Sequence, residues 1–281
     1  MRQKPKEQDK LVRRHNFEPV EENLTPEQVK EEASRCLSCK NPRCVKGCPV
    51  NIHIPDFIKA LKEDNLKEAG DIIRQTSMLP SVCGRVCPQE RQCEGNCILG
   101  IKGEAVAIGA LERYVGDNTS PEEVTIVPSG KKVAIIGSGC AGITAASDLR
   151  KAGHDVTVFE ALHQFGGVLR YGIPPFRLPR KVLDRELDNL KKMGVKFEKN
   201  VIAGKSITLT QLKEEKERLD RMLVFVQESI TKIKSEYPYC VKDILEDEKK
   251  VEQKKSEFEE LLKQYKELAE TYNAKIKEML R

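Results

Sequence analysis

The sequence of 281 residues has no tryptophan, and its 8 phenylalanines and 6 tyrosines bring aromatic residues to just 5%. It also lacks any run approaching the roughly 18 consecutive apolar residues that a membrane-spanning helix requires, which excludes a transmembrane protein. The first twenty residues, MRQKPKEQDKLVRRHNFEPV, carry charges throughout, where a secretory signal would have an apolar stretch. We therefore expect a cytoplasmic protein that has no membrane partner.

Runs of basic residues are missing as well. The 49 Lys and Arg residues are interspersed with 44 Asp and Glu residues, which gives a net charge of +5. Proteins that bind nucleic acid carry a basic patch or an aromatic-basic platform, and the sequence has neither. We therefore expect no nucleic-acid partner. The small excess of positive charge is better explained by the binding of acidic cofactors.

Composition changes near residue 120 and again near residue 213, which divides the chain into three predicted domains. Residues 1–120 contain short helical patterns, such as IPDFIKALKEDNLKEAGDIIRQ, separated by Pro and Gly. Residues 121–212 alternate between strand and helix, in the order KKVAIIG, ITAASDLRKAG, HDVTVFE, VLDRELDNLKKMG and VKFEKNV. This second zone is therefore predicted to be an α/β domain built from a βαβ unit.

Residues 213–281 show the apolar spacing that is typical of a coiled coil. Apolar residues are spaced alternately four and three positions apart up to Tyr237, and Pro238 then interrupts the predicted helix. Apolar residues then recur every seven positions at Ile244, Val251, Phe258, Tyr265, Tyr272 and Met279. We predict two helices that form a hairpin or associate with a second chain, without a polar constellation that could perform chemistry.

Eight of the ten cysteines form two groups within residues 1–120. The groups have the spacings C-x2-C-x4-C-x3-C-P and C-x3-C-x5-C-x3-C, and they comprise Cys36, Cys39, Cys44 and Cys48, then Cys83, Cys87, Cys93 and Cys97. In a reducing compartment such groups indicate metal binding before disulfides. Four thiolates complete one iron–sulfur cubane, and a final Cys-Pro serves the neighbouring cluster in bacterial ferredoxins, so the pattern predicts two clusters that share ligands between groups.

Two other interpretations of the cysteines remain open. Structural zinc sites also use thiolates, and buried cysteines without a ligand behave as small apolar residues. If clusters are bound, nearby cations should stabilise their negative charge. Five basic residues lie beside the cysteines, although each alone is more commonly a solvated charge: Lys40, Arg43, Lys46, Arg85 and Arg91.

A G-x-G-x-x-G motif directly follows the first predicted strand and opens a predicted helix; its residues are Gly137, Ser138, Gly139, Cys140, Ala141 and Gly142. The backbone N–H groups and helix dipole of such a turn face a pyrophosphate. Glu160 ends the second strand, where a carboxylate can accept hydrogen bonds from ribose hydroxyls. The motif predicts a dinucleotide-binding fold for NAD or FAD, in which Cys140 is more simply a small packing residue than a redox group.

Three stretches together resemble one family: the opening EQDKLVRRHNFEPV, the cysteine segment ASRCLSCKNPRCVKGCPVNIHIPDFI, and EALHQFGGVLRYGIPPFRLP after the second strand. The chain is similar to the small (β) subunit of NADPH-dependent glutamate synthase and to the large subunit of electron-bifurcating NADH-dependent ferredoxin:NADP oxidoreductase. The N-terminal part of dihydropyrimidine dehydrogenase is similar too. The resemblance covers residues 1 to about 212.

This resemblance implies a ligand set for each of two [4Fe–4S] clusters. The first cluster is held by Cys36, Cys39, Cys44 and Cys97. The second is held by Cys48, Cys87, Cys93 and a non-cysteine ligand, Glu112, which leaves Cys83 as a spare thiol. It also implies FAD as the dinucleotide, bound by the residues of the glycine motif together with Glu160, Gly167, Val168 and Arg177.

The sequence departs from the family after residue 212. The family continues to a second dinucleotide fold that binds NADPH and to a Gly-Asp segment that closes over the flavin, whereas this sequence has no second glycine turn. A gene fusion, a truncation followed by unrelated sequence, or an engineered chimera would each produce this pattern. We therefore expect weakened FAD binding and a chain that is incomplete as an NADPH-dependent enzyme.

The fold class predicted overall is an α-helical double [4Fe–4S] domain, a partial Rossmann-like FAD-binding domain and a C-terminal coiled coil. It indicates an electron-transfer iron–sulfur flavoprotein module of an NADPH-linked oxidoreductase. Such a module needs a protein partner. The partner would be a subunit similar to the glutamate synthase large subunit, or a protein linked to ferredoxin. The alternative is a non-catalytic assembly or redox-sensing adaptor that uses the coiled coil. Bound flavin that cycles on addition of reductant favours the first function, and stable clusters without flavin favour the second.

Overall fold

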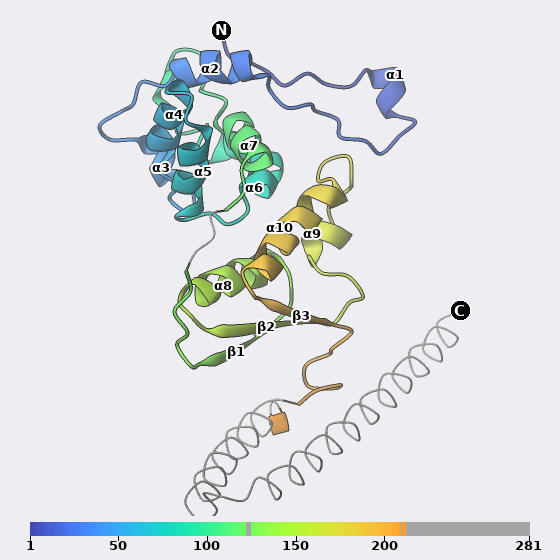
Figure 1. Cartoon of the computed structure of the whole chain (residues 1–281). Helices are drawn as coiled ribbons and strands as arrows, with labels where there is room; N and C mark the ends of the chain where they lie inside the picture. The colour runs from blue at the N-terminus through green and yellow to red at the C-terminus, as the bar shows by residue number, and fades with distance from the viewer. Residues whose placement is uncertain (122–124, 209, 212–281) are drawn as a thin grey trace, which may run out of the picture. The chain divides into compact units, whose positions relative to one another are not determined.

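A computed structural model of the chain describes residues 1–121, 125–208 and 210–211 (Figure 1). The chain divides into two compact units, Met1–Leu209 and Thr210–Arg281, and the description below concerns the first. The predicted coiled coil of residues 213–281 lies outside the described residues. The domain boundary predicted near residue 120 falls inside the first unit and stays a prediction.

The N-terminal part is helical, as its sequence patterns predict. Its elements are α1 (Lys10–Arg13), α2 (Pro26–Ser34), α3 (Arg43–Lys46), α4 (Ile54–Lys62), α5 (Leu66–Arg74), α6 (Pro80–Val86), the 3₁₀ helices η1 (Gln89–Arg91) and η2 (Ile98–Ile101), and α7 (Ile108–Asn118). A capping box at Thr25 and Gln28 starts α2. Asp64 has a φ of 57° between α4 and α5, so one continuous helical pattern becomes a pair of helices.

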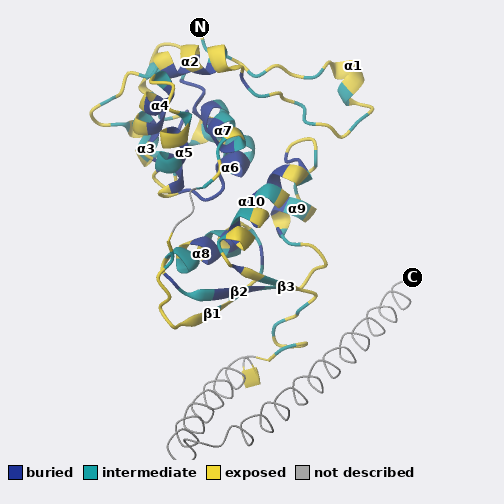
Figure 2. Ribbon diagram, viewed as in Figure 1, coloured by how far each residue is buried: buried dark blue, intermediate teal, exposed yellow. Residues whose placement is uncertain are grey.

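Helices α2, α4, α5 and α7 enclose the first apolar core (Figure 2). Phe57 of α4 and Leu111 of α7 are fully buried there. Glu32 of α2 is also fully buried, and it accepts hydrogen bonds from the backbone N–H groups of Gln3 (2.6 Å) and Ala107 (2.8 Å). These bonds satisfy the buried carboxylate and attach the N-terminal segment to the helical core.

The second part of the unit is a parallel α/β fold, which confirms the predicted βαβ unit. Its elements are β1 (Lys132–Ile136), α8 (Cys140–Lys151), β2 (Asp155–Glu160), α9 (Val168–Tyr171), α10 (Arg180–Lys192) and β3 (Lys196–Lys199). The strands lie in the order β1-β2-β3, with Val133 opposite Val156 and Val158 opposite Phe197. Helices α8 and α10 lie on one face of the sheet (Figure 1), where the second apolar core forms.

Helix α6 takes part in both halves of the unit. Gly84 of α6 and Gly116 of α7 leave no room for a Cβ, because it would lie 2.5 Å from the backbone of the opposing helix in each case. The two helix backbones are therefore in direct contact. Leu79 and Val82, by contrast, pack into the second core beside the sheet. A helix that precedes residue 120 in the sequence is thus a structural part of the α/β fold.

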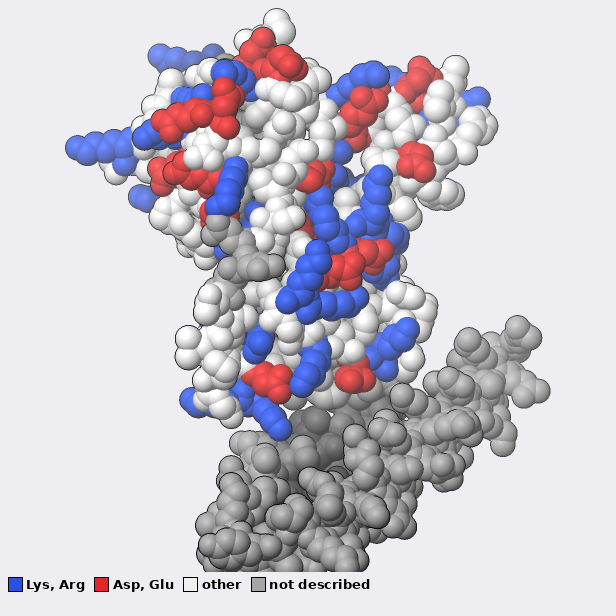
Figure 3. Space-filling view, in the orientation of Figure 1, with Lys and Arg blue, Asp and Glu red and all other residues white. Residues whose placement is uncertain are grey.

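Charges of both signs are interspersed on the face of the molecule that Figure 3 shows. Arg13, for example, pairs with Glu7 at 2.9 Å, and Lys30 pairs with Asp64 at 2.5 Å. Such exposed ion pairs contribute little stability on their own. Within the described ranges, every helix is too short or too polar to cross a membrane.

Candidate functional site

Four cysteines from the two sequence groups line one small cavity. Cys36 and Cys39 follow α2, Cys44 lies in α3, and Cys97 immediately precedes η2. The other walls include apolar side chains of α4, such as Ile54. Burial, with smaller contributions from the neighbouring Cys36 and Cys97, raises the pKa of the Cys44 thiol to about 11. A thiolate at this position therefore requires a cation beside it.

Cys83, Cys87 and Cys93 lie near Glu112, and Cys48 lies near Cys93. Burial and then the Glu112 carboxylate raise the pKa of the Cys93 thiol, and the thiol of Cys48 contributes to the rise. Burial and then the Cys87 thiol raise the pKa of Glu112 well above its ordinary value. The structure thus brings Cys48, Cys87 and Cys93 into one group with the carboxylate of α7.

Glu112 has an unsatisfied buried oxygen. Glu112 is 5% exposed. Its Oε1 atom has no hydrogen-bond partner in the described part of the chain. A buried carboxylate oxygen without a partner costs about 1–3 kcal/mol, and more when the group is ionised. The donor types, three thiols and one carboxylate, therefore fit a bound cluster that would supply the missing partner.

Cys83 belongs to the same neighbourhood, one turn before Cys87. Its thiol hydrogen-bonds to Cys87, and Ser77 Oγ donates to its sulfur at 3.9 Å. The hydrogen bond from Cys83 lowers the pKa of Cys87 to about 7. Cys83 thus lies beside the same group as Glu112 and is the alternative fourth ligand to it.

The residues of these groups do not form a single-ion site. In the described residues, no three His, Cys, Asp or Glu side chains converge closely enough to hold one metal ion. The four thiolates of a cubane each bind a different iron atom, so they lie farther apart than the ligands of one ion.

The basic residues beside the cysteines have different environments. Arg43 lines the cavity of the first cysteine group, where it can stabilise negative charge. Arg85 binds Asp117 through two hydrogen bonds of 2.8 and 2.5 Å. It thus takes part in a separate polar network, and its service to a cluster stays a prediction.

Glu94 is a buried residue of the site that sequence reasoning missed. It follows Cys93 directly, and it accepts hydrogen bonds from Gly109 N (3.0 Å) and Arg2 Nη2 (2.5 Å). Gly109 lies in the first turn of α7, one turn before Glu112. Glu94 thus fixes the start of the helix that carries Glu112. The only sequence signal for this role of Glu94 was its position next to Cys93. The two residues that donate hydrogen bonds to Glu94 are distant from it in the chain.

The glycine motif forms the expected turn between β1 and α8. Gly137 has a φ of 93°, which favours glycine, and Gly139 caps the N-terminus of α8. A Cβ on Gly142 would lie 2.0 Å from the carbonyl oxygen of Gly137. A Cβ on Gly139 would meet no atom of the described residues within 4 Å, so the space beside this residue is open to a ligand. The turn therefore has the open backbone that a pyrophosphate requires.

Ser138 joins the glycine turn to two other segments. Its hydroxyl donates to Glu160 Oε2 at 2.5 Å and accepts from the Gly166 N–H at 2.9 Å, while its own N–H donates to Glu160 at 2.9 Å. Burial tends to raise the pKa of Glu160, but hydrogen bonds from Ser138 and Leu162 outweigh it, and the pKa lies below its ordinary value. Glu160 is therefore an anionic acceptor held in place by Ser138.

Replacing Ser138 by alanine is expected to lower the free energy of unfolding by about 1.5–3 kcal/mol, because a buried hydrogen bond to a charged group is lost. The matched control is Ser129→Ala, since the Ser129 hydroxyl is exposed and contacts His154; its effect should stay within about 0.5 kcal/mol. Urea denaturation of both variants measures the difference. Equal effects would show that the Ser138 hydroxyl has no special structural role.

The remaining predicted dinucleotide residues lie in two places. Cys140 and Ala141 are exposed in the first turn of α8. Gly167 approaches the glycine turn so closely that a Cβ on it would lie 2.9 Å from Gly139 Cα, and Val168 follows at the start of α9. We call residues 137–142 together with 166–167 the glycine cradle. Arg177 instead lines a separate cavity formed with the N-terminal segment and α6–α7, so its role beside a flavin stays a prediction.

Comparison with known families gives two domain matches. Residues 13–124 match the family described as dihydropyrimidine dehydrogenase domain II, 4Fe-4S cluster. Residues 135–193 match the NAD(P)-binding Rossmann-like domain. The helical part is therefore a [4Fe–4S] cluster domain, and the α/β part is a partial dinucleotide-binding fold.

Several curated proteins are similar to residues of these two domains. The small chain of NADPH-dependent glutamate synthase from Escherichia coli is 40% identical over 206 residues, which are 72% of this chain and 44% of the relative. The corresponding protein of Azospirillum brasilense is 36% identical over 74% of this chain and 45% of the relative. The NAD-dependent dihydropyrimidine dehydrogenase subunit PreT of Escherichia coli O157:H7 is 42% identical over 68% of this chain and 48% of the relative. The chain thus spans less than half the length of these relatives.

Proposed function

Because residues 13–193 belong to the family of the glutamate synthase small chain and dihydropyrimidine dehydrogenase, we propose that the chain is an electron-transfer iron–sulfur flavoprotein module of an NADPH-linked oxidoreductase. The unsatisfied Oε1 atom of Glu112, buried beside cysteine thiols, is the observation that carries the proposal. A buried carboxyl oxygen without a hydrogen-bond partner is costly unless a bound group supplies the missing contact.

The first proposed cluster is held by Cys36, Cys39, Cys44 and Cys97. Their common position around one cavity supports this set, because it combines three cysteines of the first group with the last of the second. The apolar wall of the cavity would exclude water and lower the local dielectric, which influences the reduction potential of a cluster.

The second proposed cluster is held by Cys48, Cys87, Cys93 and Glu112, with Cys83 as a spare thiol. Electrostatic contacts among these residues support the grouping. A carboxylate is a harder donor than a thiolate, so the iron atom it binds should differ in electronic character from the other three. The two clusters should therefore have different potentials.

FAD is the proposed dinucleotide, with its pyrophosphate against the turn of residues 137–142 and its adenosine ribose near Glu160. The open space at Gly139 and the anionic state of Glu160 support this arrangement. Gly167 and Val168 would lie beside the flavin half, and Arg177 is retained there as part of the family pattern.

When bound, the clusters supply one-electron transfers and the flavin connects them to two-electron chemistry. The chain's own residues bind and orient these groups. Cysteine thiolates and Glu112 provide charge and ligands, and Ser138 holds the acceptor Glu160 in one orientation. Glu94 fixes α7 at its first turn and thereby limits movement of Glu112.

The direct test is the visible spectrum of anaerobically purified protein, together with its iron, sulfide and flavin content. Two [4Fe–4S] clusters correspond to about eight iron and eight sulfide per chain. A colourless protein that contains zinc would reject the proposal. Stable clusters in a protein that takes up no added FAD would favour the adaptor function over the flavoprotein function.

The purified 281-residue chain is expected to oxidise NADPH slowly or not at all, because its sequence shows no second glycine turn for that nucleotide. Dye reduction with NADPH as donor measures this activity, and dithionite serves as the positive control for the clusters. Rapid NADPH-dependent dye reduction would contradict the prediction. We further propose a partner subunit that carries the second half-reaction, as the names "small chain" and "subunit" of the relatives suggest.

A further inference from the structure

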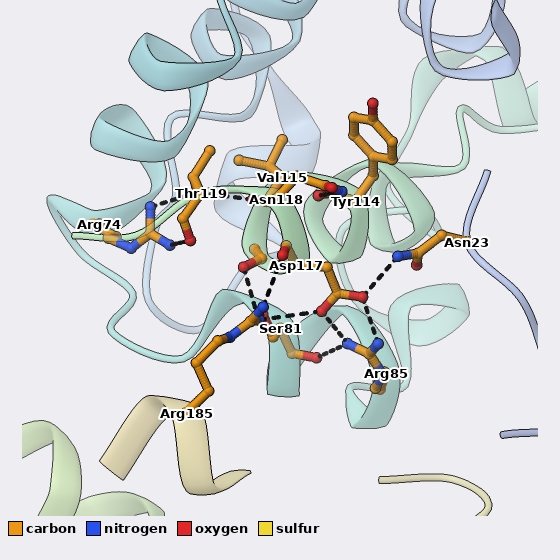
Figure 4. A network of polar contacts seen from close by, with 11 residues as sticks. Asn23, Arg74, Ser81, Arg85, Tyr114, Val115, Asp117, Asn118, Thr119 and Arg185 are labelled. Carbon is orange, nitrogen blue, oxygen red and sulfur yellow. Dashed lines mark hydrogen bonds and ion pairs between the residues drawn. The ribbon is translucent and has the colours of Figure 1, made fainter. Parts of the chain in front are cut away.

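The helix pair α6–α7 carries residues of the second cysteine group and also the polar network that Figure 4 shows. Cys87 ends α6 and Glu112 lies in α7. Because Gly84 and Gly116 bring the two backbones into direct contact, a displacement of one helix displaces the other. The position of this pair therefore determines where the proposed second cluster lies.

Arg185 reaches this pair from α10, which belongs to the α/β fold. Its guanidinium donates to the carbonyl oxygens of Gly116 (3.0 Å) and Asp117 (2.7 Å) and to Ser81 Oγ (2.6 Å). The two carbonyls lie in the last turn of α7, where helix carbonyls lack intrahelical partners and a positive charge is favourable. Arg185 thus caps α7 from a distant part of the chain.

Asp117 completes the network at the end of α7. It binds the guanidinium of Arg85 with both carboxylate oxygens, accepts from Asn23 Nδ2 at 2.8 Å, and lies 3.4 Å from Arg185 Nη2. Arg85 and Asp117 are a largely buried pair with bidentate geometry. Loss of Arg185 would therefore leave Asp117 paired, so a variant at position 185 should still fold.

The same helix α10 also supports the glycine cradle. Leu183, two residues before Arg185, is fully buried and occupies the space beside Gly166, where a Cβ would lie 2.6 Å from Leu183 Cδ2. Leu183 and Leu187 pack into the second core together with Val82 of α6. A short chain of contacts thus runs from the end of α7 through α10 to the cradle.

We propose that Arg185 is a positioning residue that fixes the glycine cradle relative to the helix pair α6–α7. One planar guanidinium binds three acceptors on two helices. This arrangement provides a rigid connection that the ammonium group of a lysine would not provide. The consequence for electron transfer rests on the proposed function. The contact of Arg185 would set the distance between the flavin and the second cluster, and the rate of electron transfer depends steeply on that distance.

Hydrogen exchange of the full chain, measured by mass spectrometry, tests the connection without any need for bound cofactor. In Arg185→Ala, exchange should become about tenfold faster in the last turn of α7 and also in residues 166–170, because charged hydrogen bonds are lost. Arg185→Lys should give an intermediate change in both segments. Lys181→Ala is the matched control, since Lys181 is exposed on the same helix, and it should change neither.

Faster exchange confined to the last turn of α7 would show a local cap and overturn the proposal, as would unchanged exchange in both segments. In protein that contains clusters and flavin, Arg185→Ala should also slow electron exchange between them about tenfold at unchanged iron, sulfide and flavin content. An unchanged rate would reject the role in electron transfer. Protein without cofactors would reject the proposed function, while the exchange data would still decide on Arg185.

Discussion

Replacing Glu112 by alanine should lower the iron content from about eight to about four atoms per chain, because the second proposed cluster loses one of its four ligands. Alanine removes the carboxylate that lies among the cysteine thiols and leaves a space at a buried position. Iron and sulfide assays on anaerobically purified protein measure the loss. Electron paramagnetic resonance of the reduced protein should show the signal of the first cluster alone.

Two further variants make this result specific. Glu112→Gln retains an oxygen donor and should keep most of the iron while changing the potential of one cluster. Cys83→Ala should leave the iron content unchanged, since the Cys83 thiol is proposed to be spare. The reverse outcome, with iron lost in Cys83→Ala and retained in Glu112→Ala, would make Cys83 the ligand and Glu112 a buried structural acid.

Gly139→Ala is expected to lower the affinity for FAD at least about tenfold, because the added methyl group would occupy the space through which a pyrophosphate approaches the backbone. The substitution should leave the unfolding midpoint unchanged, since the new Cβ meets no described atom within 4 Å and φ is −68°. Titration with FAD, followed by flavin fluorescence, measures the affinity, and thermal unfolding without ligand measures stability.

Gly142→Ala is the informative comparison for this prediction. Its Cβ would lie 2.0 Å from the Gly137 carbonyl oxygen, so the turn must shift, at a cost of about 1–3 kcal/mol in stability. We therefore expect Gly142→Ala to impair stability and binding together, and Gly139→Ala to impair binding alone. Normal FAD affinity in Gly139→Ala would place the ligand elsewhere on the chain.

Features of the fold that depend on local sequence were predicted correctly. The β1–α8–β2 unit follows from two β-branched runs and a glycine turn within about thirty residues, and each of these signals acts on its own neighbours. The helical pattern of residues 54–75 was predicted too. Its division into two helices was not, because the division depends on the positive φ of Asp64, which the sequence of this segment does not indicate.

Contacts between distant residues could not be predicted from the sequence. Cysteine spacing alone indicates clusters but does not tell which thiols share one, and the family resemblance was needed to combine Cys97 with the first group. Arg185 and Asp117 are 68 positions apart, and neither belongs to a motif. Their contact exists only in the folded chain, where α10 brings the guanidinium of Arg185 to the largely buried carboxylate of Asp117.

The shared helix α6 limits how this architecture can be taken apart in evolution. Leu79 and Val82 precede the predicted boundary near residue 120, yet they complete the core beneath the parallel sheet. A gene that inherited the cluster segment alone would expose these two side chains, and a gene that inherited the α/β segment alone would lack part of its interior. A chain divided at that boundary would therefore lose stability on both sides of it.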